Sequence, residues 1–160
     1  MMGAKGEALA RQFEAKAQDA VTVVEKLSDA DWKKVTAAEK WTVGVTAHHL
    51  AGAFEPVAGI ITAIVSGQLP GGFSRVMLDE RNAQHAREHA NCTKAETIAL
   101  LKKGAPVAAA MLRGLSDDQL ARSGTVFTDA PAMTAEQVVM GGLINHIDEH
   151  FGSIRKTVGK

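Results

Sequence analysis

The sequence contains few of the residues that support disulfide-linked folds and β-sheets. Cys92 is its single cysteine, only 4% of its 160 residues are aromatic, and it contains no Tyr. One cysteine excludes an intramolecular disulfide and a thiolate-rich zinc site. Because strands favour aromatic and β-branched side chains, this composition, with 46% hydrophobic residues, favours closely packed helices instead.

The sequence also lacks a net charge and a long basic run. Its 18 basic and 18 acidic side chains argue against the positive stripe that nucleic-acid-binding or membrane-surface proteins need. Residues 1–7 lack the apolar core of a signal peptide, and the apolar stretch around residues 57–65 is far shorter than a membrane span. We therefore expect a cytoplasmic protein with no nucleic-acid or membrane partner.

The spacing of apolar residues predicts four main helices. Residues 6–27 carry an apolar stripe with spacings of three and four, and residues 42–65 are apolar on nearly all sides. Further helices are expected over residues 74–114 and 134–158, and residues 32–40 are expected to be an irregular connection. We predict one all-α domain over residues 1–160, an up-down four-helix bundle with a short extra helical turn.

Local signals refine these helices and leave one question open. Capping boxes of the form Ser/Thr-x-x-Glu/Gln begin at Thr93, Ser116 and Thr134, which predicts a helix start after each. The first box leaves open whether residues 74–114 form one bent helix or two helices. Pro56 predicts a kink or break in the second helix, because proline removes a backbone hydrogen bond and clashes with the preceding turn.

The six histidines occur as three pairs, His48/His49, His85/His89 and His146/His150. His146 and His150 are four residues apart in a predicted helix, so both imidazoles leave one face about one turn apart. Two nitrogens at this spacing can bind one metal ion, although such a pair also occurs on ordinary helix surfaces. A buried His49, in a mostly apolar helix, would need a hydrogen-bond partner or a ligand.

Two segments of the chain resemble the DinB/YfiT-like family. Residues 41–50 begin with Trp-Thr and end with His-Leu, which resembles the opening of that family's second helix. In that pattern the histidine directly before Leu is a metal ligand, so the resemblance selects His49 over His48. Residues 142–150 resemble the family's last helix, where two histidines four residues apart complete a triad.

The resemblance implies a four-helix bundle in which His49, His146 and His150 bind one divalent ion, Zn²⁺ or Ni²⁺. Three protein nitrogens leave a coordination position for water or substrate, as in catalytic sites. Ile147 stands where a zinc protease carries its glutamate, so that motif's general base is absent. The resemblance and the all-round apolar second helix also lead us to expect a homodimer.

The other candidate residues receive less specific predictions. His48 projects about 100° away from His49, so we expect it at the surface or supporting the site. His85 and His89 are expected on a solvated helix face, with a second metal site as the alternative. Cys92 is expected to pack as a small apolar side chain or to be exposed, and Glu149 is a marginal candidate for supporting the metal ligands.

Two classes of function remain open from the sequence. The first is a metalloenzyme acting on a small molecule: a thiol S-transferase of the bacillithiol or mycothiol type, or a hydrolase, as the resemblance implies. The second is a non-catalytic, stress-associated helical bundle that binds a metal or a small molecule. No residue is assigned as a catalytic base, and the fold alone does not choose between the two classes.

Overall fold

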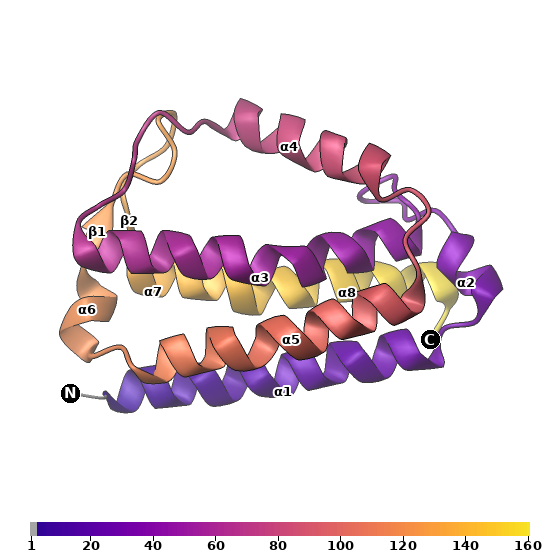
Figure 1. Ribbon diagram of the computed structural model, residues 1–160, viewed down its shortest axis with the longest axis horizontal. Helices are drawn as coiled ribbons and strands as arrows, with labels where there is room; N and C mark the ends of the chain where they lie inside the picture. Colours follow the sequence, from indigo (N-terminus) through magenta and orange to yellow (C-terminus); the bar gives the residue numbers. More distant parts are fainter. Residues whose placement is uncertain (1–2) are drawn as a thin grey trace.

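Four long helical segments form a bundle, as the apolar periodicity predicts (Figure 1). The computed structural model describes residues 3–160. The bundle helices are α1 (Ala4–Lys26), α3 (Val43–Ser66), α5 (Lys94–Arg113) and a last segment that ends in α8 (Asn145–Val158). Both α1 and α3 pack against α5 and α8, which closes the bundle around one core. The prediction of an all-α four-helix bundle is confirmed.

The region of residues 74–114 forms two helices, which settles the question left open by its capping box. The first, α4 (Arg75–Glu88), lies outside the bundle and has no buried residue. It carries the chain back along the molecule, so that α3 and α5 run in the same direction (Figure 1). The second, α5, begins after the predicted capping box at Thr93. As a result α4 is the least embedded of the long helices.

The core is built from the apolar stripes of the four bundle helices. Phe13 of α1 and Phe54 of α3 meet edge to face with ring centroids 5.0 Å apart, and both are almost fully buried. Phe151 of α8 is buried in the same cluster. Aromatic side chains bury the largest apolar area per residue, so these three rings compensate for the low aromatic content of the chain.

Short elements connect the bundle helices. These are α2 (Asp29–Lys33), α6 (Asp117–Ala121) and the two-residue antiparallel strands β1 (Ser123–Gly124) and β2 (Met133–Thr134). The capping box predicted at Ser116 opens α6. The irregular connection predicted for residues 32–40 is wrong at its start, because Ser28 and Asp31 form a further capping box that opens α2.

Of the kink or break predicted at Pro56, a break is excluded, because α3 continues through this residue. Pro56 and Gly52 are both exposed, so water can reach the Gly52 carbonyl that proline leaves without a helical partner. By its length and composition alone, α3 is long and apolar enough to cross a membrane. The apolar stretch at residues 57–65 is thus only part of a longer apolar helix. A helix buried in the core of a bundle can have the same length and composition.

The last predicted helix is not uniform. It consists of α7 (Ala135–Val138), a π-helical segment η1 (Val139–Ile144) and α8. The predicted capping box at Thr134 opens α7. The wider π turn ends just before His146, and such turns are frequent near functional sites. Nothing in the sequence analysis anticipated this segment.

Candidate metal centre

His49, His146 and His150 converge between α3 and α8. Each of the three rings offers a nitrogen, and these nitrogens all lie within 4.8 Å of one another. The Nε2 atoms of His146 and His150 are 2.9 Å apart. The His49 ring stands edge-on to both, with centroid distances of 5.3 Å to His146 and 5.0 Å to His150. The structure thus brings together the three residues that the resemblance selected.

A carboxylate that the sequence did not indicate, Glu39, holds one of these rings. His150 Nδ1 and Glu39 Oε2 are 2.7 Å apart, and Ser153 Oγ donates to Glu39 Oε1 at 2.6 Å. Only 9% of the Glu39 and His150 side chains is exposed. Burial alone would raise the pKa of Glu39, but the hydrogen bonds led by those from Ser153 and His150 lower it below its ordinary value.

An ionised Glu39 fixes the tautomer of His150. A carboxylate oxygen accepts hydrogen bonds and cannot donate, so the proton of a neutral His150 lies on Nδ1. The lone pair then lies on Nε2, the atom that faces His146. This carboxylate–histidine arrangement is the one that commonly supports a metal-binding imidazole.

The other two imidazoles are neutral at physiological pH. Burial lowers the pKa of His49 to about 3, and the neighbouring imidazoles add to the shift. Burial, followed by the proximity of His150, lowers the pKa of His146 to about 4, with the Gly142 carbonyl opposing the shift. A metal ion binds neutral imidazole, so the protein environment already favours the form that acts as a donor.

The Trp-Thr pair at the start of α3 places His49. The Thr42 hydroxyl caps α3 by accepting from the Val45 amide at 3.1 Å. The Trp41 ring packs edge-on against His49 with the centroids 5.2 Å apart, while the Trp41 carbonyl accepts from Thr36 at 2.8 Å. The motif therefore starts the helix and provides one wall of the histidine cluster.

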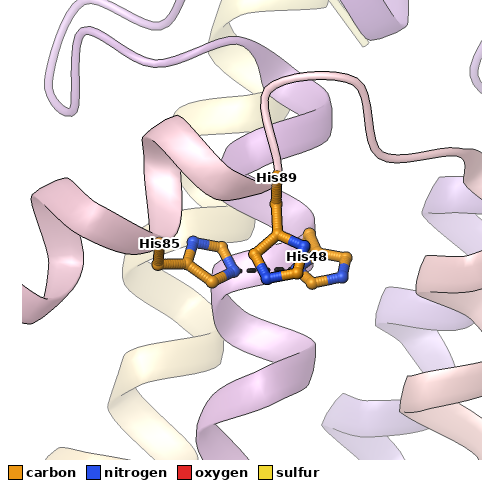
Figure 2. A group of neighbouring side chains, drawn as sticks. All are labelled: His48, His85 and His89. Atoms are coloured by element: carbon orange, nitrogen blue, oxygen red, sulfur yellow. Dashed lines mark hydrogen bonds between the residues drawn. The ribbon is translucent and has the colours of Figure 1, made fainter.

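The remaining histidines form a second cluster, contrary to the predicted solvated face (Figure 2). His48 is buried, and His85 and His89 are partly buried. The expectation that His85 and His89 are solvated is wrong because the start of α3 turns His48 outward beneath them.

Cys92 is half-buried, and burial raises the pKa of its thiol. Glu149 is exposed and Glu39 takes the supporting role considered for it.

Residues 13–141 match the sequence family described as the mycothiol maleylpyruvate isomerase N-terminal domain. The chain belongs to this family. It is a DinB/YfiT-like protein, as the motifs predicted. The match ends before His146, so two of the three candidate ligands lie beyond it. No curated protein matches the chain.

A solved structure supports the same fold. The chain is similar to YfiT from Bacillus subtilis, described as a probable metal-dependent hydrolase with an unusual four-helix bundle topology. The two share 20% sequence identity with a TM-score of 0.68, over 97% of this chain and 86% of YfiT. At this identity the similarity establishes the fold, and the reaction has to be argued from the residues of this chain.

The donor set fits a divalent transition-metal ion. Imidazole suits Zn²⁺ and Ni²⁺, and three imidazoles with a carboxylate behind one of them are the ligands of many catalytic zinc sites. The Nε2 atoms of His146 and His150 lie 2.9 Å apart, and a bound ion would accept a lone pair from each of them.

Proposed function

We propose that the chain is a metal-dependent S-transferase that activates a low-molecular-weight thiol of the mycothiol type. The observation that carries the proposal is the cluster of His49, His146 and His150, in which Glu39 holds the His150 ring. A divalent ion held there supplies Lewis acidity, which lowers the pKa of a thiol in its open coordination position. Membership of the mycothiol maleylpyruvate isomerase family supports the choice of thiol.

The residues around the cluster favour a thiol over water as the nucleophile. Within the described residues 3–160, Glu39 is the one carboxylate that hydrogen-bonds to the triad. Both of its oxygens are engaged, one by His150 and the other by Ser153, so it is poorly placed to accept a proton from a nucleophile. A thiol ionises near pH 8.5 whereas water has a pKa of 15.7, so a thiol depends less on a general base.

The first test is a reaction screen with the metal-loaded protein. Zn²⁺- or Ni²⁺-loaded chain is incubated with mycothiol or bacillithiol and a panel of electrophiles, and S-conjugates are measured by mass spectrometry. We expect conjugates that form only with metal and thiol present. Hydrolysis of esters or amides without thiol would assign a hydrolase instead, and absence of turnover with any substrate would favour the non-catalytic binding protein.

Matched variants connect the reaction to the cluster. His146→Ala should abolish conjugate formation, and the matched control at a neighbouring exposed position, Glu149→Gln, should retain it. His49→Ala should remove the same equivalent of bound metal as His146→Ala, measured by elemental analysis. If either histidine variant keeps the full metal content of the unmodified chain, the proposed ligand set is wrong.

A further inference from the structure

The second histidine cluster joins α4 to the bundle. His48 lies on α3, His85 lies on α4, and His89 caps the end of α4. Figure 2 shows the three rings gathered between the two helices. Each ring offers a nitrogen within 4.8 Å of the other two, and His48 Nδ1 is 2.8 Å from His85 Nε2. Three imidazoles from two separate elements therefore meet at one point.

We propose that His48, His85 and His89 form a second divalent-metal site, of the Zn²⁺ type, which fastens α4 to the bundle. The site uses none of the ligands of the first triad and stands whether or not that triad binds metal. Two adjacent residues of α3, His48 and His49, point about 100° apart and so serve different clusters.

The chemistry of the three side chains supports metal binding. Burial, together with the proximity of His48 and His89, lowers the pKa of His85 to about 4, so this ring is neutral at physiological pH. Its Nε2 atom, the one that faces His48, is the nitrogen that His85 offers to the cluster. The rings of His48 and His89 stack with centroids 4.2 Å apart, and the His85 ring lies 4.6 Å from His89 and 5.0 Å from His48, centroid to centroid.

The surroundings of the cluster provide a route for an ion. A hollow of about 420 Å³ borders His48 and His89 and is lined on its far side by residues of α5, among them Glu96 and Lys103. The Glu96 carboxylate therefore lies in the same hollow as His48 and His89. A carboxylate in the hollow attracts cations, and the hollow leaves space for water on a bound ion.

The position of α4 gives the site a structural consequence. Because α4 buries no residue, apolar packing contributes little to holding it against α3. A metal bound to one residue of α3 and two at the end of α4 would replace that missing packing. His85 also lies beside the first triad, with its ring centroid 5.7 Å from that of His49. Fastening α4 therefore also fixes one wall of the first site.

The test counts metal equivalents by Zn²⁺ titration and elemental analysis in the unmodified chain and in single and double variants. We expect two equivalents in the unmodified chain, one in His89→Ala, one in His146→Ala and none in the double variant. Arg87→Ala, an exposed change between His85 and His89, should keep both. If His89→Ala and His85→Gln bind as much Zn²⁺ as Arg87→Ala, the second site is wrong, whereas an unchanged His146→Ala would count against the first triad alone.

Hydrogen exchange supplies a second readout that a merely structural histidine cluster would not move. Amides of α4 exchange when the helix opens away from the bundle, and a metal bound to its end must first be released. Zn²⁺ at 100 times its Kd should therefore slow amide exchange in α4 about 100-fold. His146→Ala should keep this slowing, and His89→Ala should lose it. Equal exchange rates in α4 with and without Zn²⁺ in the His146→Ala protein would overturn the proposed fastening.

Discussion

Replacing Glu39 tests whether the buried carboxylate supports the first metal site. Glu39→Gln preserves the shape of the side chain and removes its charge, and Glu39→Ala removes the side chain. The Gln carbonyl can still accept from His150 Nδ1, while its amide group faces Ser153, whose hydroxyl can turn to accept. The first variant therefore removes charge with little loss of hydrogen bonding.

The size of the effect follows from the bonds that change. A hydrogen bond to a charged group contributes about 1.5–3 kcal/mol, and a neutral one about 0.5–1.5 kcal/mol. The difference of about 1–1.5 kcal/mol predicts that Glu39→Gln weakens Zn²⁺ binding roughly tenfold. Glu39→Ala also frees the His150 ring to rotate, and loss of such a supporting group typically weakens binding about 10- to 100-fold. Glu39→Ala should therefore bind Zn²⁺ more weakly than Glu39→Gln.

The assay is competition for Zn²⁺ between the protein and a chelating dye of known affinity at pH 7.5. His89→Ala serves as the background protein, so that the second cluster does not contribute. Glu149→Gln removes the same charge from an exposed position beside His150 and should bind Zn²⁺ within about twofold of that background. Should both Glu39 variants bind as tightly as Glu149→Gln, the carboxylate would have no role in supporting the ligand.

Two further predictions concern stability. A methyl group at Gly6 would lie 2.6 Å from the backbone carbonyl oxygens of Leu112, in the last turn of α5, and Leu115, just after that helix. Gly6→Ala should therefore lower the free energy of unfolding, measured in urea titrations, by about 1–3 kcal/mol. Gly59 has open space around it, so Gly59→Ala should raise the free energy of unfolding by about 0.5–1 kcal/mol. A hydrogen bond from Lys34, followed in strength by one from Lys160, holds the pKa of Asp31 well below its ordinary value. The ionised Asp31 therefore stabilises the fold above about pH 4, and this stabilisation is lost as the pH falls. Measured by thermal unfolding, Asp31→Asn should therefore destabilise the chain at pH 7 and destabilise it progressively less below about pH 4. The control Asp29→Asn, at an exposed position, should change stability little at either pH. Equal signs for the two Gly variants, or a pH-independent effect of Asp31→Asn, would contradict these explanations.

The sequence predicts the fold and the histidine pair of α8 for local reasons. Helix periodicity depends on neighbours three and four residues apart, so α1, α3 and the His146/His150 spacing can be recognised without knowing the tertiary structure. Selecting His49 over His48 required the family resemblance, because two adjacent histidines in an apolar helix look equivalent. The tertiary structure separates them, directing each to a different cluster.

The residues that the sequence did not reveal act over long distances along the chain. Glu39 lies 111 positions before His150, in a segment expected to be irregular. The sequence indicated only that a buried imidazole needs a hydrogen-bond partner. That requirement does not say which residue the partner is. His85 and His89 were expected in solvent because polar residues surround them in the sequence, among them Arg87, Glu88 and Asn91. That local pattern contains no sign that the end of α4 meets His48.

The π turn before His146 has a signal in the sequence that is visible once the structure is known. Apolar residues in the last helical segment recur at steps of four: Ala135, Val139, Leu143, Ile147 and Phe151, all buried. In an α-helix with 3.6 residues per turn, four residues cover about 400°, so such a stripe drifts by about 40° at each step. The η1 segment holds more residues per turn and takes up this drift, which keeps the stripe facing the core. His146 lies two residues after the end of η1, so the same adjustment that packs the helix also sets the direction in which this candidate ligand points.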